Sequence, residues 1–346
     1  MVPIRLGLIG LGWIGETHAK CAIQLGCERI VSCDSDPAKE VIAQKLGIPF
    51  YRDYREMLKK ETIDGVVISL PNELHESVGT YCAERGLHIL IEKPIAHTVE
   101  SAERIIGSTK KHNVKLLVGH YRRFNPKVVE ARRLVQEGEL GKIIGVSVLW
   151  CVYKDDTYFS IPWRRQKGAG PILINGIHEI DTLRFILGEI ERVFSEVSNT
   201  TRKFEVEDTA SITVRFAKGA VGTIFISDTV PSLWAYEYGA GENPFFNRTN
   251  EDSYYFFGTK AALTVPRMRK VYYPDPLKIG WQYPTKVVTV DVPESDPYIL
   301  QLQHFCNVIK GTEEPRTSGE DALKTLRVVH AILESGKKKL PVTVPL

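Results

Sequence analysis

Short apolar runs alternate with helical patterns through the first third of the chain. Residues 4–9 form a nearly continuous apolar run, which is typical of a strand buried on both faces of a sheet. Strands are predicted at 4–9, 29–33, 50–51, 65–69, 87–91 and 115–119, and helices at 16–25, 37–45, 54–60, 73–85 and 99–111. This alternation predicts an α/β domain over residues 1–122, built on a doubly wound parallel sheet.

The pattern changes after residue 122. Helices are predicted at 126–137, 177–187, 298–310 and 319–337, and strands at 143–153, 193–200, 209–216, 220–228, 253–258, 263–266 and 287–292. Helices on one side of a large, mostly antiparallel sheet describe an α+β domain, which we expect over residues 123–346. Residues 230–249 are rich in aromatics, Gly, Asn and Pro, and are predicted to form a long ordered loop near a functional site.

Composition narrows the class of protein. The 346 residues are 43% hydrophobic and 25% charged, which is typical of a globular protein, and the net charge of +3 comes with no dense basic block that would suggest nucleic-acid binding. No apolar stretch approaches the ~20 residues of a membrane span. The predicted first strand leads directly into a glycine motif, so we interpret the N-terminus as part of the fold rather than a signal peptide and expect a cytoplasmic protein.

The six cysteines include Cys21, Cys27 and Cys33, whose even spacing invites a metal site. They fall on a predicted helix, a connector and a strand, with no CxxC pair and no matching histidines. We therefore expect free thiols and no metal site.

A glycine motif follows the first predicted strand and precedes a helix. In such a turn Gly10 permits the tight bend, Gly12 lets a pyrophosphate approach the backbone, and Gly15 allows close packing. The helix N-terminus, with Trp13 and Ile14, then faces the phosphates with its N–H groups. This arrangement predicts a Rossmann domain that binds a dinucleotide.

Asp34 ends the second predicted strand, near the spacing expected for a carboxylate that accepts from the adenosine ribose hydroxyls. A carboxylate repels a 2′-phosphate, so NAD is favoured over NADP. The alternative is that Asp34 caps the next turn, with Asp36 close by.

Two further segments follow strands at the carboxyl edge of the sheet, where ligands bind in open parallel sheets. Ser69, Pro71 and Asn72 follow the fourth strand; Asn72 can cap the next helix, contact the nicotinamide ribose, or both. His75 lies one turn later and is either a local helix residue or a cofactor contact. Glu92-Lys93-Pro94 follows the fifth strand, where the lysine can reach the reacting end of a nicotinamide cofactor.

Taken together, these motifs resemble those of the Gfo/Idh/MocA family of oxidoreductases, and the resemblance extends along essentially the whole chain. The resemblance is carried by the glycine motif, Pro71-Asn72, Glu92-Lys93-Pro94, the segment from Gly119 to Pro126, Pro162-Trp163-Arg164, and Gly168-Ala169-Gly170 leading to Gly176-Ile177-His178-Glu179-Ile180-Asp181. It implies NAD(P)-linked oxidation or reduction of sugars or cyclitols, with Lys93 and His178 catalytic. We also expect a homodimer or homotetramer formed through the C-terminal sheet.

The chemistry accounts for both residues. A neutral imidazole at His178 can take the hydroxyl proton, and Lys93 can donate to the same oxygen as negative charge develops. Asp181 lies three residues after His178 and either orients the ring or forms a structural salt bridge. Many family members carry an aspartate where this chain has Ile174, so Asn175, Tyr121 or His120 is considered as polar support for Lys93 and His178.

Further candidate contacts come from segments before and after the second domain begins. His120 and Tyr121 are considered for the substrate, although a Tyr packed at a domain junction is an equal alternative, and Arg122 is considered for the cofactor. Trp163 and Arg164 resemble an element that reaches toward cofactor and substrate. In the predicted loop, Trp234 combined with Glu237, Glu242 and Asn243 suits a polyhydroxylated ring, and an oligomer contact is the alternative.

The sequence therefore favours an NAD-dependent dehydrogenase that acts on a secondary hydroxyl of a sugar, cyclitol or related polyol. Two alternatives stay open. One is an enzyme that oxidises its substrate only transiently in order to cleave a glycoside, and the other is a non-catalytic NAD-binding regulator, against which the presence of both Lys93 and His178 argues.

Overall fold

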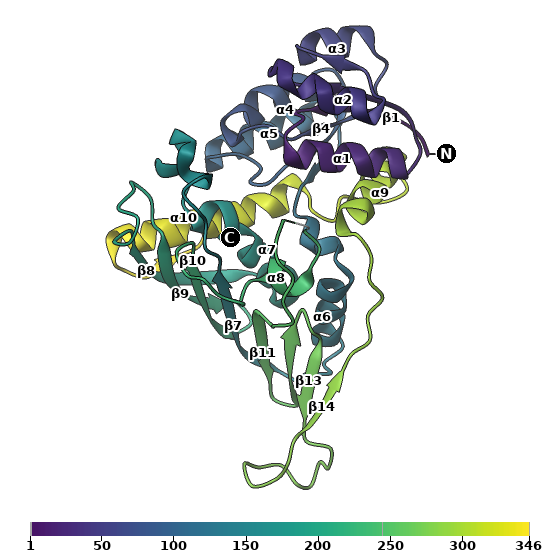
Figure 1. Ribbon diagram of the computed structural model, residues 1–346. Coiled ribbons are helices and arrows are strands. Elements are labelled where there is room, and N and C mark those ends of the chain that lie inside the picture. Colours follow the sequence, from purple (N-terminus) through teal and green to yellow (C-terminus); the bar gives the residue numbers. More distant parts are fainter. Residues whose placement is uncertain (1, 244, 346) are drawn as a thin grey trace. The chain divides into compact units, whose positions relative to one another are not determined.

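A computed structural model describes residues 2–243 and 245–345. The chain forms two compact units (Figure 1). The first holds the chain as far as Phe124 together with Asp296–Leu326, and the second holds Asn125–Ser295 together with the chain from Arg327.

The first unit is built on a parallel sheet of six strands in the order β3-β2-β1-β4-β5-β6. Its strands are β1 Val2–Ile9, β2 Cys27–Cys33, β3 Phe50–Tyr51, β4 Gly65–Ile68, β5 His88–Ile91 and β6 Leu116–Val118. Its helices are α1 Trp13–Gln24, α2 Glu40–Leu46, α3 Tyr54–Lys60, α4 His75–Ala83, α5 Val99–Lys111 and α9 Pro297–Ile309. This order is that of a doubly wound Rossmann sheet, so the predicted fold class is confirmed.

The order of the sheet changes direction between β1 and β4, which both leave their carboxyl ends at one edge. All four residues of β4 are buried, as is expected of a central parallel strand covered on both faces. Polar caps set where the helices begin: the Asp53 carboxylate accepts from Arg55 N before α3, and Thr98 Oγ1 accepts from Ser101 N before α5.

Helix α9 completes the core of the first unit. It begins after Asp296, whose carboxylate accepts from Tyr298 N at 2.8 Å, and it lies against α1 (Figure 1). Its buried Leu302 and Phe305 pack in one apolar cluster with Leu6 of β1. A segment that follows strands β7–β14 of the second sheet in sequence therefore covers the first sheet.

The second unit contains a sheet of nine strands in the order β14-β13-β12-β11-β7-β10-β9-β8-β15. Its strands are β7 Ile143–Cys151, β8 Ile190–Ser198, β9 Thr209–Phe216, β10 Val221–Ser227, β11 Tyr254–Gly258, β12 Ala261–Val265, β13 Arg269–Tyr272, β14 Lys286–Thr289 and β15 Val342–Thr343. Only β7 and β10 pair in parallel; the other neighbours are antiparallel, as predicted.

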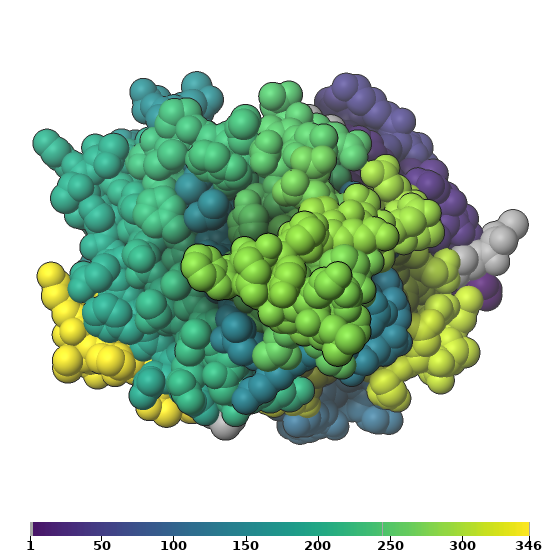
Figure 2. Space-filling model, turned by 90° about the horizontal axis from the view of Figure 1, so that it is seen from below, coloured from purple at the N-terminus to yellow at the C-terminus, as the bar shows by residue number. Residues whose placement is uncertain are grey.

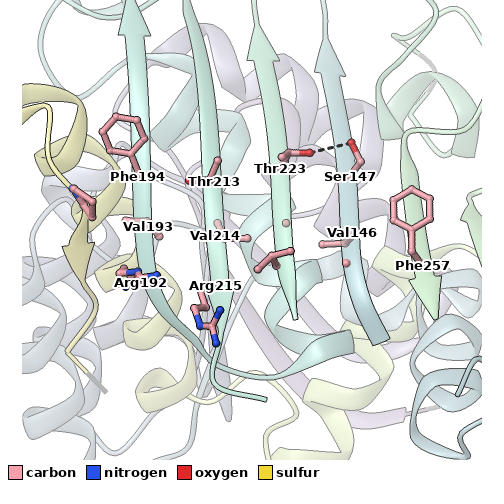
Figure 3. A pocket seen from close by; sticks show the side chains of 14 residues that line it. Val146, Ser147, Arg192, Val193, Phe194, Thr213, Val214, Arg215, Thr223 and Phe257 are labelled. Carbon is pink, nitrogen blue, oxygen red and sulfur yellow. Dashed lines mark hydrogen bonds between the residues drawn. The ribbon is translucent and has the colours of Figure 1, made fainter. Parts of the chain in front are cut away.

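Helices cover one face of this sheet, and the alternation of buried and exposed residues along β9 and β10 shows that the other face is open. The helices are α6 Pro126–Gln136, α7 Ile177–Leu187, α8 Tyr236–Ala240 and α10 Gly319–Lys338, whose first residues belong to the first unit. Figure 3 shows Phe194, Thr213, Thr223 and Ser147 side by side on the open face, with a 3.1 Å hydrogen bond between the last two hydroxyls.

The long segment between β13 and β14 carries exposed apolar side chains. Trp281 is 99% exposed and Leu277 is 92% exposed. In Figure 2 the residues near 270–290, green to yellow-green, stand in front of the other strands of the second unit.

Three features were missing from the sequence interpretation. The predicted loop at 230–249 contains the short helix α8, and β13 and β15 are additional strands at or near sheet edges. Residues Ile172–Gly176 form a π-helical turn that continues directly into α7. These elements are short, so they contain too few residues for a periodic pattern to show.

Candidate functional site

The glycine turn after β1 has the geometry that the sequence predicted. Gly10 has a φ of +95°, and a Cβ there would lie 2.4 Å from Ser69 O. A Cβ on Gly15 would lie 2.0 Å from Gly10 O, so both positions require glycine. A Cβ on Gly12 would meet no atom within 4 Å, and this open space lies in front of the N-terminus of α1, near Trp13 and Ile14.

Asp34 holds this turn from the end of β2. Its Oδ2 accepts from Leu11 N at 2.7 Å, and its Oδ1 accepts from Asp36 N at 2.9 Å. Asp36, not Asp34, caps the 3-10 turn that follows. A carboxylate has about four acceptor positions, so Asp34 keeps capacity for ribose hydroxyls. Arg52 donates to Ser35 O, the carbonyl of the residue that follows Asp34.

Ser69 supplies a polar atom beside the glycine turn. Its N donates to Ile9 O at 2.8 Å, while its Oγ is buried and has no hydrogen-bond partner among the residues that the structure describes. A buried hydroxyl without a partner is costly unless a ligand or water satisfies it. Together with the open space at Gly12 and the helix N-terminus, it fits the phosphates and ribose of a dinucleotide.

His75 is fully buried and connects two loops at the carboxyl edge of the sheet. Its Nδ1 lies 3.0 Å from Pro94 O, and its Nε2 lies 2.9 Å from Leu70 O. Burial lowers the pKa of the ring, although the carbonyl contacts oppose this. Asn72 begins a 3-10 turn rather than capping α4, so its predicted capping role is wrong, while Pro71 precedes that turn.

Glu92 is a buried carboxylate at the end of β5. Its Oε1 lies 2.9 Å from His18 Nε2 of α1, and its Oε2 accepts from Lys93 N at 3.2 Å. A Cβ on Gly119 would lie 2.8 Å from the carboxylate, so the glycine leaves room for it. Burial opposes ionisation of Glu92, but the His18 contact outweighs it and the pKa of Glu92 is lowered. These contacts fix the backbone from which the Lys93 side chain projects.

The three residues after Gly119 are buried in the first unit. His120, Tyr121 and Arg122 each have a relative exposure of at most 7%. The ring of Tyr121 stacks on Tyr298 of α9, with centroids 4.4 Å apart, and the ring of His18 meets Tyr298 edge-on. Tyr121 therefore packs against Tyr298, as expected if it is a packing residue and not a substrate contact.

In the second unit, the start of α7 carries the predicted histidine. His178 and Asp181 are buried in the first turns of this helix, all of whose residues are buried. Asn175 lies in the π-helical turn three residues before His178, and residues three apart share a side of a helix. Ile174 occupies the position next to it in the same turn.

Lys154 is a functional candidate that the sequence interpretation missed. Its Nζ donates to Asn175 Oδ1 at 2.8 Å and lies 3.7 Å from Asp228 Oδ2. Burial raises the pKa of Asp228, while Lys154 and then Arg202 oppose the increase. The signal was available in the alternation along β7, because Lys154 lies two and four positions beyond the inward-facing Val152 and Trp150.

Trp163 and Arg164 belong to a 3-10 turn close to Lys154. Trp163 is half exposed, and Arg164 Nη1 donates to Tyr158 O at 2.9 Å. The Tyr158 ring lies 4.2 Å from the Arg164 guanidinium and 4.8 Å from Lys154 Nζ. Tyr158 therefore connects the turn that carries Trp163 with the end of β7.

Trp234 lies beside Cys151, the last residue of β7, and is 43% exposed. Its carbonyl accepts from Cys151 N at 2.8 Å, which fixes its backbone. Glu237 is buried and accepts from Trp150 Nε1 at 3.0 Å, and Glu242 accepts from Asn125. The Glu237 carboxylate therefore has a partner in the core, and its predicted contact with substrate hydroxyls stays a prediction.

Among residues 2–243 and 245–345, no helix has the length and apolarity needed to cross a membrane. The six cysteines are free thiols. Within the same residues, no group of three or more His, Cys, Asp or Glu side chains is arranged to hold a metal ion.

Comparisons with known proteins agree with this geometry. Residues 4–120 match the family model described as "Oxidoreductase family, NAD-binding Rossmann fold", and residues 128–264 match "GFO/IDH/MocA C-terminal domain". The chain is 27% identical to the myo-inositol 2-dehydrogenase of Thermotoga maritima, covering 97% of each chain. It is 28% identical to the scyllo-inositol 2-dehydrogenase (NAD(+)) of Bacillus subtilis, covering 98% of this chain and 96% of that one.

A solved structure supports the fold independently. The WlbA dehydrogenase from Bordetella pertussis, in complex with NADH and UDP-GlcNAcA, is similar over 99% of each chain, with a TM-score of 0.79 and 22% sequence identity.

The geometry around Glu92 predicts a pH-dependent effect of replacing His18. In the native protein the lowered pKa of Glu92 adds stability that is present above ~4.3, the ordinary carboxyl value, and is lost as the pH falls through the folded value. In His18→Ala, the contact with His18 that lowers the pKa of Glu92 is lost, so burial raises that pKa. We expect a loss of about 3–5 kcal/mol in unfolding free energy near neutral pH, which shrinks as the pH is lowered.

Urea unfolding at several pH values measures this effect. His18→Gln keeps a donor in reach of Glu92 and is the matched control, so it should recover part of the loss. Parallel pH profiles for the native protein and His18→Ala would contradict the interpretation.

Proposed function

This chain belongs to the GFO/IDH/MocA oxidoreductase family, and we propose that it oxidises a secondary hydroxyl of a sugar, cyclitol or related polyol with NAD. The observation that carries the proposal is the first unit's carboxyl edge, where the glycine turn held by Asp34 and the Lys93 backbone held by Glu92 occur on one sheet. The nicotinamide, when bound, accepts the hydride. Because its relatives are named as dehydrogenases, neither transient glycoside oxidation nor non-catalytic regulation is favoured.

Lys93 and His178 are proposed as the catalytic residues. Oxidation of an alcohol requires removal of the hydroxyl proton, and the His178 imidazole is the proposed acceptor. The Lys93 ammonium is proposed to donate to the same oxygen and stabilise the developing alkoxide. Asp181 is proposed to orient His178 from within the same helix, where it is almost completely buried.

The remaining predicted contacts keep their proposed roles. For the cofactor they are Gly10, Gly12, Trp13, Ile14, Asp34, Ser69, Pro71, Asn72, His75, Glu92, Lys93, Arg122, Trp163 and Arg164. For the substrate they are Lys93, His120, Tyr121, Trp163, Asn175, His178 and Trp234. For His75 and Glu92, burial and the contacts to neighbouring loops favour positioning of the cofactor loops over direct contact.

The open face of the second unit's sheet is proposed to join two copies of the chain. Val221 and Phe225 of β10 are exposed. A pocket on this face is lined by Val221 and by Phe257 of β11, and Figure 3 shows Phe257 in it. An apolar sheet face of this kind is commonly covered by a symmetry-related copy.

The cofactor proposal predicts that NAD binds more tightly than NADP, because Asp34 repels a 2′-phosphate. Asp34→Ser should narrow this preference, and the nearby Arg52 should then favour NADP. Titration of protein fluorescence with NADH and NADPH measures both affinities. Adding Arg52→Gln to Asp34→Ser should remove the gain in NADPH affinity. Equal affinities of the native protein for NADH and NADPH would contradict the prediction.

The catalytic proposal predicts that Lys93→Met and His178→Ala each lower kcat by roughly 10²–10⁴-fold, while the affinity for NADH changes by less than about 10-fold. The assay is formation of NADH with myo-inositol, scyllo-inositol and a set of aldoses. A variant with near-native turnover on the best of these compounds would require a new role for that residue.

The assembly proposal predicts that Val221→Lys weakens self-association, because it places a charge on the open sheet face. Light scattering after size-exclusion chromatography measures the mass. Val41→Lys on α2 is the control, since Val41 is 51% exposed and Val221 is 53% exposed. A native protein that stays monomeric at all concentrations tested would refute this assembly.

A further inference from the structure

Lys154 occupies a position that the fold would normally give to an apolar side chain. The pairing of β7 with β10 continues beyond Cys151, because Val152 N donates to Ser227 O and Lys154 N donates to Asp228 O, each at 3.0 Å. The second bond is shifted by one residue on β10, and Lys154 lies two and four positions beyond the buried Val152 and Trp150. Its side chain is only 9% exposed. A buried ammonium is costly unless it is paired, so its partners indicate what it does.

Of Asn175 and Asp228, the Asn175 side chain lies closer to the Lys154 ammonium. Nζ lies 2.8 Å from Asn175 Oδ1, compared with 3.7 Å from Asp228 Oδ2. Asp228 has another cation, since Arg202 Nε donates to its Oδ1 at 2.9 Å. Lys154 is thus not the sole partner of Asp228, and of these two side chains Asn175 is the one closer to its ammonium.

An ammonium can only donate, and this decides which way the amide of Asn175 turns. The oxygen must face Lys154, so the NH₂ group points away from it. In the described part of the chain this NH₂ group has no hydrogen-bond partner, and Asn175 is only partly buried. Asn175 is therefore held as a donor whose protons are available to another molecule.

We propose that Lys154 is a positioning residue that fixes Asn175 as a hydrogen-bond donor to the substrate, so that the substrate atom bound there is an acceptor oxygen. The proposal rests on the proposed function. An amide is not a base near neutral pH, so Asn175 does not receive the hydroxyl proton. Asn175 therefore binds the substrate, and proton acceptance is left to His178.

Two variants separate the donor from the residue that orients it. Asn175→Leu removes the donor, and Lys154→Met releases the amide to rotate. Each should lower kcat/KM by roughly 10–100-fold, with NADH affinity unchanged, as expected for one well-placed hydrogen bond. The double variant should be little worse than either alone, because both remove the same interaction. Lys154→Arg, which keeps a cationic donor, should recover part of the loss.

Arg202→Met provides the matched control. It also takes a cation from Asp228, but its contacts are with Asp228 and with the Lys154 carbonyl, not with Asn175. Lys154→Met and Arg202→Met should both lower the melting temperature, and only Lys154→Met should change kcat/KM by more than about 3-fold. Asn175→Asp is a second discriminator, since it should raise stability through an ion pair with Lys154 while losing activity.

The same assay compounds, myo-inositol, scyllo-inositol and the aldoses, serve as probes. Losses that multiply in the double variant, or an Arg202→Met effect equal to that of Lys154→Met, would overturn the positioning role while leaving the proposed function intact. A native protein that binds NADH but oxidises none of the compounds would overturn the proposed function, and this role with it.

Discussion

The constraint on which the first unit's site depends is the burial of a charged carboxylate at Glu92. A carboxylate placed among apolar strand ends is stable only with donors close to it. His18 reaches it from α1, Lys93 N reaches it from the next residue, and Gly119 leaves the space that a Cβ would fill. The same helix α1 begins at the glycine turn, so the contact between His18 and Glu92 connects the dinucleotide turn with the proposed catalytic lysine.

In the second unit, charged side chains are likewise buried at the ends of the central strands, which is unfavourable unless they are paired. Asp228 and Lys154 both lie where β10 and β7 end, and each is largely buried. Arg202 also donates to the Asp228 carboxylate, and the Lys154 ammonium donates to the Asn175 side chain. A charge that would only destabilise a core can therefore orient a neutral amide, because a donor-only group allows one orientation of that amide.

Buried carboxylates elsewhere in the second unit accept hydrogen bonds from large aromatic side chains. Glu237 accepts from the indole of Trp150, and Glu179 of α7 accepts from the Tyr254 hydroxyl. Both carboxylates satisfy large buried aromatic residues that would otherwise leave a polar atom without a partner. These contacts fix how α7 and α8 pack against the buried aromatic residues.

The sequence by itself determined the parts that depend on local periodicity and on short motifs. The strand–glycine–helix order, Asp34 at the end of β2 and the lysine after β5 identified the parallel sheet and its binding edge, because neighbouring residues decide these features. Tertiary structure alone decided the partners that are distant in sequence: His18 with Glu92, Lys154 with Asn175, and α9 with the first sheet. Such pairs join residues with no fixed spacing, and a buried charge selects its partner only when the chain has folded around it.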